Sequence, residues 1–259
     1  MSGINSPLQN RLLAGLPLEV SQRLIPQLKH VALVRNKALY ESGEMTHHVF
    51  FPTDAIVSLL YETDDGTSTE VSMVGNDGAI GFAMFLGGES THSRAVVQMS
   101  GNAYLLTRQQ LIQEFNHNSA LKRSLLCYTL SLITQMSLTA VCNRFHTINQ
   151  QLSRWLLEAQ DRVQRDSFNI THDQVAQMLG VRREGVTVAA CKLQRQGIIS
   201  YHRGRVTVVD RPRLEAQSCE CYQVVRRESD RLLNNNCPVH PPASSRTDPR
   251  RDLSRAALR

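Results

Sequence analysis

The chain has 259 residues, of which 41% are hydrophobic and 20% charged, so it is long enough for two modest domains of ordinary soluble composition. No apolar run reaches the roughly 20 residues that a membrane-spanning helix needs, and the N-terminus lacks a signal peptide's apolar segment, so we expect a cytoplasmic protein without membrane contact. The net charge of +6 divides into −1 over residues 1–149, +4 over residues 150–215 and +3 over residues 216–259, which favours a polyanionic partner for the C-terminal part.

The first elements are predicted from hydrophobic spacing. Apolar residues recur at helical spacing over residues 8–28, which predicts one or two short helices with boundaries at Pro17 and Pro26. Short runs of β type follow, separated by glycine-containing turns, and they cover residues 29–34, 38–42, 47–52, 55–62, 68–75, 94–100 and 102–107. Such a series is typical of a β-sandwich or jelly roll, and Asp65-Gly66 marks a hairpin within it. We assign residues 1–118 to this β-domain.

A long helix is predicted next, because residues 119–149 contain neither proline nor glycine. A heptad-like stripe of mixed polarity runs along it and consists of Leu121, Leu125, Tyr128, Leu132, Gln135, Thr139 and Cys142. A helix of this length needs a large surface to pack against. We prefer a second copy of the chain, which predicts a homodimer with this helix as its dimerisation helix, and burial within the domain is the alternative.

Residues 150–215 show the pattern of a winged helix-turn-helix. Thr171 and Gln174 form a capping box that begins one helix, and Gly180 ends it at a sharp turn. A second helix follows over residues 182–196. Two alternating apolar runs then flank Arg203-Gly204, which predicts a β-hairpin wing.

The start of the second helix carries side chains suited to reading base edges in the major groove. An arginine can bridge guanine O6 and N7, and a glutamate can accept from cytosine N4, so Arg183 and Glu184 are candidate base contacts. Arg182 is a candidate for a base or for a phosphate. Thr187 and Val188 lie one turn further on and could meet a base edge or a thymine methyl, although Val188 is equally well explained by helix packing.

A second group of residues is placed to contact the phosphate backbone, which positions a protein on DNA without specifying sequence. These residues lie at the start of the first helix and on the predicted wing, and they are Thr171, Tyr201, His202, Arg203 and Arg205.

The block ITHDQVAQMLGVRREGVTVAACKLQRQGIISYHRGRVTVVD resembles the DNA-binding domain of the Crp/Fnr (cyclic-AMP receptor protein and fumarate–nitrate regulator) family, and the resemblance covers roughly residues 11–215. It implies an α+β fold: an N-terminal cyclic-nucleotide-binding-type β-roll as sensor, a long dimerisation helix and a C-terminal winged helix-turn-helix. The family's Arg-Glu recognition pair maps onto Arg183 and Glu184. A further base-contacting arginine of the cyclic-AMP-responsive members maps onto Val188, which implies a different operator.

The resemblance also implies a function. It predicts a transcription regulator that binds a pseudo-palindromic operator in double-stranded DNA as a homodimer, with RNA polymerase as a further candidate partner. The alternative is a ligand-binding module that acts on a protein partner without binding DNA. We expect no enzymatic activity, because no Ser/His/Asp or paired-carboxylate arrangement is recognisable.

The family's nucleotide pocket is degenerate in this chain. Cyclic-nucleotide-binding members hold the ribose with a glutamate after a glycine, and here Gly81 is followed by Phe82, which cannot accept a hydrogen bond. The position of the phosphate-binding arginine holds Ser93, and Arg94 lies one residue later, on the opposite face of a strand. We therefore expect an effector other than cyclic AMP.

We expect residues 216–259 to be a basic, disordered tail, because they lack a sustained apolar period. Cys219, Cys221, Cys237 and His240 resemble metal ligands in type, but their spacing fits no strong zinc pattern. Buried, inert thiols are the interpretation we prefer for the cysteines of the long helix. We therefore expect neither a metal nor a cofactor.

Overall fold

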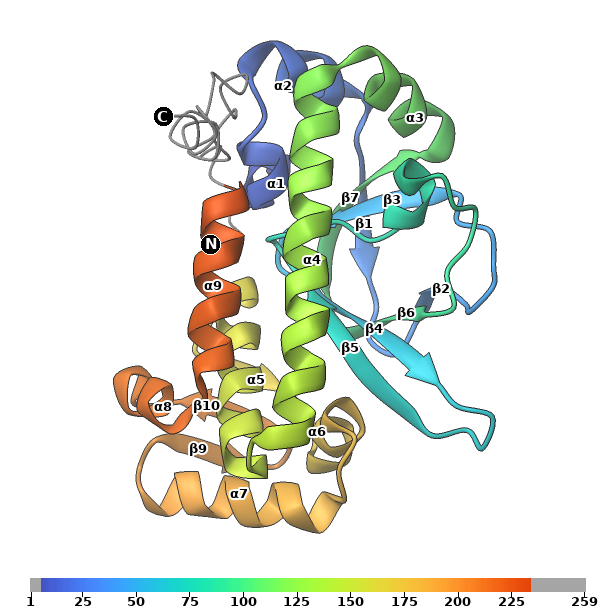
Figure 1. The fold of residues 1–259 in the computed structure, drawn as a ribbon. Helices are drawn as coiled ribbons and strands as arrows, with labels where there is room; N and C mark the ends of the chain where they lie inside the picture. The colour runs from blue at the N-terminus through green and yellow to red at the C-terminus, as the bar shows by residue number, and fades with distance from the viewer. Residues whose placement is uncertain (1–5, 234–259) are drawn as a thin grey trace, which may run out of the picture.

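The computed structural model describes residues 6–233 and has a β-roll, a long helix along one side of it and a helical domain at one end (Figure 1). Short helices precede the roll: η1 (Pro7–Gln9), α1 (Arg11–Ala14), α2 (Leu18–Leu24) and η2 (Ile25–Gln27). This confirms the helices expected before the first strand.

Each predicted β-type run contains a strand, so the β-roll expected for the N-terminal part is confirmed. Over residues 29–107 the strands form antiparallel sheets of order β1-β7-β3 and β2-β6-β4-β5. Their bounds are β1 (Lys29–Leu33), β2 (Ala38–Tyr40), β3 (His48–Pro52), β4 (Ile56–Glu62), β5 (Ser68–Val74), β6 (Arg94–Met99) and β7 (Gly101–Thr107). The predicted hairpin joins β4 to β5, with Gly66 at a φ of 81° that favours glycine.

The long helix is shorter than predicted. After α3 (Arg108–His117), α4 spans Ser119–Phe145 and α5 begins at Ile148, so the boundary expected at residue 149 is wrong. His146 has an extended backbone, and Thr147 caps α5 through a reciprocal capping box with Gln150. The Thr-x-x-Gln pattern at residues 147–150 is the sequence signal for this break.

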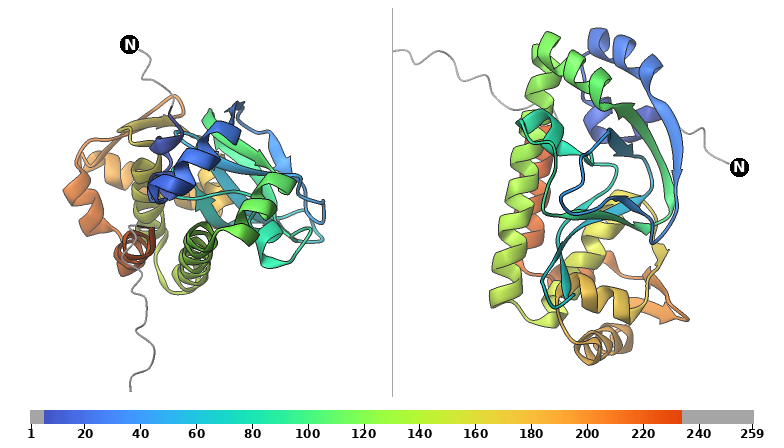
Figure 2. Two further views of the ribbon diagram at one scale, coloured as in Figure 1. Left: turned by 90° about the horizontal axis from the view of Figure 1, so that it is seen from above. Right: turned by 90° about the vertical axis from the view of Figure 1, so that its right-hand side faces the viewer.

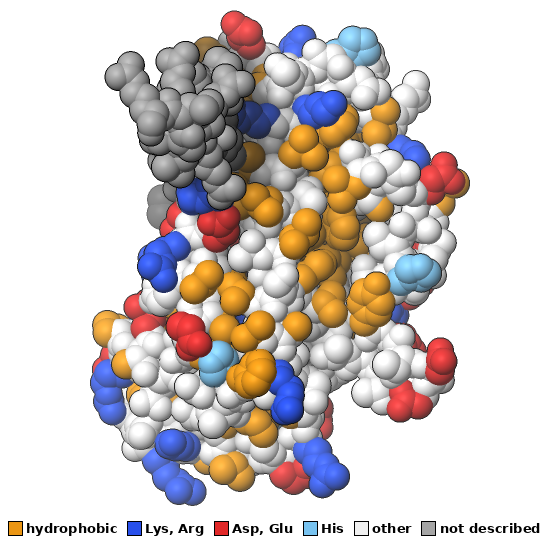
Figure 3. All heavy atoms as spheres, viewed as in Figure 1, with side chains coloured by type: hydrophobic (Ala, Val, Ile, Leu, Met, Phe, Trp, Pro, Cys, Tyr) orange, Lys and Arg blue, Asp and Glu red, His pale blue; other side chains and the backbone are white. Residues whose placement is uncertain are grey.

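The stripe assigned to the dimer interface faces the chain's own interior, which corrects that assignment. Six of its seven side chains are buried against the roll or against α9 (Glu220–Leu233). The six are Leu121, Leu125, Tyr128, Leu132, Gln135 and Cys142. A different apolar row on α4 is exposed, and it consists of Leu126, Leu130, Ile133, Val141 and Phe145. Apolar side chains gather along this face of α4 in Figure 3.

The helix α4 is long and apolar enough to span a membrane, with a mean hydropathy of 1.5. The expectation that no segment of the chain has this length and hydrophobicity is therefore wrong. The most apolar part of the helix is 33% buried inside the chain. Since α4 packs against the roll and α9, it is a core helix of which one face, carrying the exposed apolar row, is open to solvent.

The predicted winged helix-turn-helix is confirmed in the C-terminal part. Its elements are α5 (Ile148–Val163), β8 (Ser167–Asn169), α6 (His172–Leu179), α7 (Arg183–Arg195), β9 (Ile199–His202), β10 (Arg205–Val208) and α8 (Arg211–Gln217). Gly180 ends α6 in the left-handed conformation with a φ of 62°. Arg203 and Gly204 form the wing turn with φ values of 47° and 76°.

The prediction of a disordered tail is wrong for residues 216–233. They complete α8 and form α9, which lies beside α4 in Figure 1 and in both views of Figure 2. The helix buries one face, made of Cys221, Tyr222, Val225, Ser229, Leu232 and Leu233. These residues recur at helical spacing, and the arginines between them hide the period in the sequence. The rest of the predicted tail lies outside the described residues.

The helical domain packs against the β4–β5 hairpin of the roll. Ile56, Leu60, Met73 and Met99 of the roll belong to the same hydrophobic core as α5, α6 and α7. The side chain of Trp155 donates to Glu70 Oε1 at 3.0 Å across this boundary. Burial raises the pKa of the Glu70 carboxyl to about 7. This packing leaves α7 on the side of the domain away from the roll (Figure 1).

Candidate nucleic-acid interface

The helix-turn-helix exposes one face of α7. The helix buries Val186, Ala189, Ala190 and Leu193 against the rest of the domain. Gly185 lies so close to Ile148 that a Cβ at this position would meet Ile148 Cδ1 at 2.6 Å, so glycine allows the start of α7 to approach α5. The opposite side of α7 is exposed to solvent.

The predicted base-reading residues occupy the open N-terminal end of α7. Arg182 is the N-cap, its side chain makes no capping hydrogen bond, and Arg182, Arg183 and Glu184 are exposed. Arg183 Nε lies 3.3 Å from Asp173 Oδ1, with both side chains nearly two-thirds exposed. An ion pair this exposed contributes at most about 1 kcal/mol, so Arg183 can exchange Asp173 for a base edge at little cost.

Thr187 and Val188 differ in their surroundings. The hydroxyl of Thr187 donates to Arg183 O at 3.1 Å and lies 3.0 Å from His172 Nδ1, so it is already bonded within the domain. Burial and the nearby Arg183 charge lower the pKa of His172, which favours a neutral ring there. Val188 is 70% exposed, which removes helix packing as the explanation for this side chain.

Three of the five predicted phosphate contacts are exposed on the wing: His202, Arg203 and Arg205. Arg205 donates to Ser167 Oγ at 2.6 Å, which holds it beside β8. On α7, Lys192 and Arg195 are also exposed, and neither was among the predicted DNA contacts. Their spacing from Val188, at i+4 and i+7, is the signal that places them on its side of the helix.

The other two predicted phosphate contacts have structural roles. Thr171 accepts from Gln174 N at 3.3 Å in the capping box and donates to the Gln174 side chain. The Tyr201 hydroxyl donates to the carbonyl oxygen of Ile170, and burial raises its pKa to about 12. Both hydroxyl protons are therefore used inside the domain, which disfavours a phosphate contact by either hydroxyl.

The four residues predicted to form a degenerate effector pocket lie in or beside the strands of the roll. Gly81 precedes η3 (Phe82–Leu86) with a φ of 102°, and Phe82 packs against the roll's core. Ser93 is buried, and its Oγ lies 3.1 Å from Thr91 Oγ1. Arg94 is paired with Glu41 at 3.0 Å and with Glu62 at 3.7 Å. Ser93 precedes β6 and is buried, whereas Arg94 is the first residue of the strand and is partly exposed, so the two side chains differ in burial as predicted.

The helical domain resembles a known family of domains. Residues 150–217 match the model of the Crp-like helix-turn-helix domain. No curated protein is similar to the chain in sequence at a significant level.

Solved structures resemble the fold over about three quarters of the chain. FixK2 from Bradyrhizobium japonicum superposes with a TM-score of 0.64 at 16% identity, covering 74% of this chain and 98% of its own. The c-di-GMP-responsive global regulator CLP from Xanthomonas campestris has a TM-score of 0.60 at 13% identity, with coverages of 74% and 99%. A Crp/Fnr-family transcriptional regulator from Thermus thermophilus has a TM-score of 0.59 at 18% identity, with coverages of 73% and 98%. The chain therefore has a Crp-like helix-turn-helix domain and the overall fold of the Crp/Fnr family of transcription regulators.

Proposed function

We propose that this protein is a sequence-specific DNA-binding transcription regulator that acts in the cytoplasm as a homodimer and has no enzymatic activity. The observation that carries the proposal is the open start of α7, where Arg182, Arg183 and Glu184 stand exposed. A helix of this kind fits the major groove, and its first turn meets the base edges. The positive end of the helix dipole adds to the attraction for DNA.

Specificity in this proposal comes from the first two turns of α7. Arg183 reads guanine through O6 and N7, and Glu184 accepts from cytosine N4. The exposed Val188 offers a methyl surface for thymine in place of a further arginine, so the operator differs from that of the cyclic-AMP-responsive relatives. The wing residues His202, Arg203 and Arg205 hold the phosphates on either side.

Dimerisation in this proposal uses the exposed apolar row of α4. This row lies on the face of α4 away from the roll, and a second copy packed against it would bury apolar surface that water now covers. Two helix-turn-helix domains related by a two-fold axis then read half-sites about one helical turn apart. RNA polymerase remains a candidate partner of the DNA-bound dimer.

The effector in this proposal is not a cyclic nucleotide. Phe82 offers no acceptor for a ribose hydroxyl, and the Arg94 guanidinium is held by Glu41 and Glu62. A buried cyclic phosphate without a cationic partner would lose its hydration without compensation. DNA binding should therefore not depend on cyclic AMP.

The test is selection of bound fragments from the source genome, followed by band shifts on the enriched sequence and on a shuffled duplex. We expect the enriched sequence to be bound at least about 1000-fold more tightly than the shuffled one. Arg23→Ala, which removes an exposed arginine of α2, serves as the control that leaves binding unchanged. Equal affinity for both duplexes, or no DNA binding, would overturn the proposal and favour a module that acts on a protein partner.

A further inference from the structure

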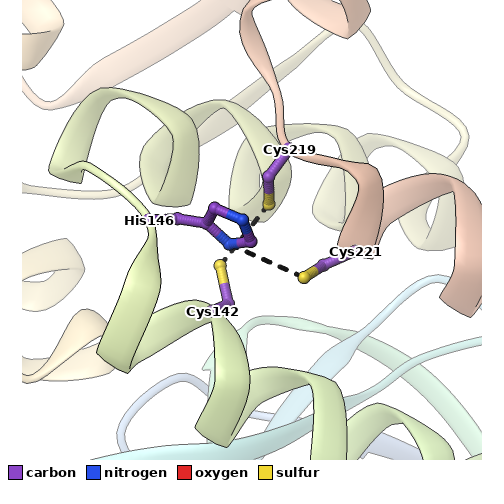
Figure 4. A group of neighbouring side chains, drawn as sticks. All are labelled: Cys142, His146, Cys219 and Cys221. Atoms are coloured by element: carbon purple, nitrogen blue, oxygen red, sulfur yellow. Dashed lines mark hydrogen bonds between the residues drawn. The ribbon is translucent and has the colours of Figure 1, made fainter.

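Three cysteines and a histidine meet where the end of α4 touches the start of α9 (Figure 4). Cys142 Sγ lies 3.5 Å from Cys219 Sγ, and Cys221 Sγ lies 3.7 Å from His146 Nδ1. The possible ligand atoms of all four residues lie within 4.8 Å of one another. The cluster belongs to neither the DNA-reading helix nor the sensor pocket.

Local structure holds each pair of residues in place. Cys142 lies in the last turn of α4, and His146 is the C-cap of this helix, whose backbone N–H donates to Cys142 O at 3.0 Å. Gln151 donates to Cys142 O at 3.3 Å and to His146 O at 2.9 Å, which fixes this last turn. Cys219 and Cys221 stand on either side of the first residue of α9. Hydrogen bonds thus hold Cys142 and His146 together, and Cys219 and Cys221 flank the start of α9.

The side chains of the cluster are buried and oriented. Cys142, Cys219 and Cys221 are at most 3% exposed, and the side chain of His146 is 12% exposed. His146 Nε2 lies 3.3 Å from Glu220 Oε1, so the nearby carboxylate favours the tautomer with the proton on this nitrogen. The lone pair of Nδ1 is then directed toward the sulfurs. A carboxylate behind a metal-binding histidine is the usual way in which proteins set this tautomer.

The spacing suits one tetrahedral ion. Zn–S bonds of about 2.3 Å and Zn–N bonds of about 2.0 Å place tetrahedral ligand atoms about 3.5–3.8 Å apart. The Cys142–Cys219 and Cys221–His146 distances already fall in this range, and the widest pair needs to contract by at most about 1 Å. Three thiolates and an imidazole are soft donors that select zinc over magnesium or calcium. An iron–sulfur cluster would hold its cysteine sulfurs further apart, because more than one iron atom lies between them.

A buried positive charge lies beside the cluster. The Arg154 guanidinium interacts electrostatically with Cys142 and Cys219, and its Nε is buried without a hydrogen-bond partner among residues 6–233. Three thiolates, a neutral imidazole and Zn²⁺ together carry one negative charge. Arg154 already pairs with Glu158 at 2.9 Å through Nη1, and it is placed to stabilise this further negative charge as well.

We propose that Cys142, His146, Cys219 and Cys221 form a structural Cys3His site for a zinc ion. All four positions of the tetrahedron are filled by protein, which is typical of a structural site. Bound zinc would fasten the start of α9, directly after the DNA-binding domain, to the end of α4. It would therefore fix the helix of the proposed dimer interface relative to the domain that reads DNA.

The test measures metal on the full chain and needs no DNA, so its outcome is independent of the proposed function. The protein is purified under reducing conditions, its zinc is quantified, and the chelated protein is titrated with Co²⁺. We expect about one zinc per chain and the intense thiolate-to-cobalt absorption of a tetrahedral site. Cys219→Ser should lose at least about 90% of the metal, whereas Cys127→Ser, elsewhere on α4, should keep it.

Two further variants keep the test informative if Cys219→Ser fails to fold. His146→Cys should still bind Co²⁺ and shift its spectrum toward that of a four-thiolate site. Cys237→Ser, in the part of the chain beyond the described residues, should bind as the wild type does. The proposal is overturned if the reduced wild type shows no thiolate-to-cobalt absorption, if folded Cys219→Ser keeps its metal, or if His146→Cys leaves the cobalt spectrum unchanged.

Discussion

Replacing Ile133 by aspartate should separate the proposed dimer into folded monomers. Ile133 is 52% exposed in the middle of the apolar row of α4, so the substitution leaves the chain's own core in place. Its neighbour Leu132 is 3% exposed and packs in the roll's core. The adjacent positions therefore predict opposite failures: Ile133→Asp should dissociate the dimer, and Leu132→Asp should unfold the chain.

The magnitude follows from the exposed fraction. Complete burial of an isoleucine side chain is worth about 1.5–3 kcal/mol, so covering the exposed half of Ile133 contributes about 0.8–1.5 kcal/mol per copy. Both copies lose this contribution, and bringing two new carboxylates into the interface adds a cost of about 2 kcal/mol or more. A total of about 4 kcal/mol raises the dimer dissociation constant about 1000-fold.

Sedimentation equilibrium from nanomolar to micromolar protein measures this shift directly. Circular dichroism melting verifies that Ile133→Asp remains folded, and Leu18→Asp provides a control at a side chain that is 72% exposed on α2. Affinity for a palindromic operator should fall together with the dimer, because one half-site supplies only part of the contacts. A wild-type dimerisation constant in folded Ile133→Asp would refute the assignment of the interface to this row.

Three further predictions concern DNA, pH and effector. Arg183→Ala should cost about 1–3 kcal/mol of binding free energy on the operator and relax sequence specificity, whereas Arg203→Ala should weaken binding to all duplexes alike and reduce the slope of the salt dependence by about one unit. Anisotropy titrations at several salt concentrations measure both effects. Equal losses of affinity on specific and random DNA for Arg183→Ala would contradict the assignment. Folded Glu70 keeps its proton up to about pH 7, whereas the unfolded chain releases it near 4.5, so stability falls as the pH rises through this window. Glu70→Gln should therefore change stability little at pH 5 and add up to about 3 kcal/mol at pH 8, as measured by urea unfolding, and a pH-independent difference would exclude this titration. Calorimetric titration with cyclic AMP or cyclic GMP should show no binding, and micromolar affinity would mean that Arg94 leaves its carboxylate partners to reach the phosphate.

The DNA-binding domain could be predicted from sequence because its signals are local. Thr171 and Gln174 close their capping box within one turn, and Gly180 adopts the positive φ that its position after a helix implies. The wing turn at Arg203-Gly204 is equally local. These patterns do not predict the hydrogen-bond partner of each hydroxyl group. The Tyr201 hydroxyl, for example, donates to the carbonyl oxygen of Ile170 inside the domain.

The partners of α4 could not be predicted, because the helix has apolar residues on opposite faces. Leu125 and Leu132 continue one row, and Leu126 and Ile133 continue the other, with the same seven-residue spacing. Helical periodicity tells which residues share a face and does not tell which face the roll takes. The missed helix α9 has a related cause, since Arg226 and Arg227 interrupt its apolar face in the sequence while lying on the exposed side of the helix.

The cysteine cluster could not be predicted from sequence either, and it adds a further role to α4. Cys142 and His146 are a usable i, i+4 pair, but Cys219 follows 77 residues after Cys142, and sequence spacing alone cannot join segments so far apart. In the folded chain, one face of α4 packs against the roll and the opposite face carries the apolar row of the proposed dimer interface. The end of the helix carries two of the proposed metal ligands. A shift of α4 against the roll would therefore move the proposed dimer interface and the attachment of α9 together. An effector that repacked the roll against Leu125 or Leu132 would therefore act on both proposed features through the same helix.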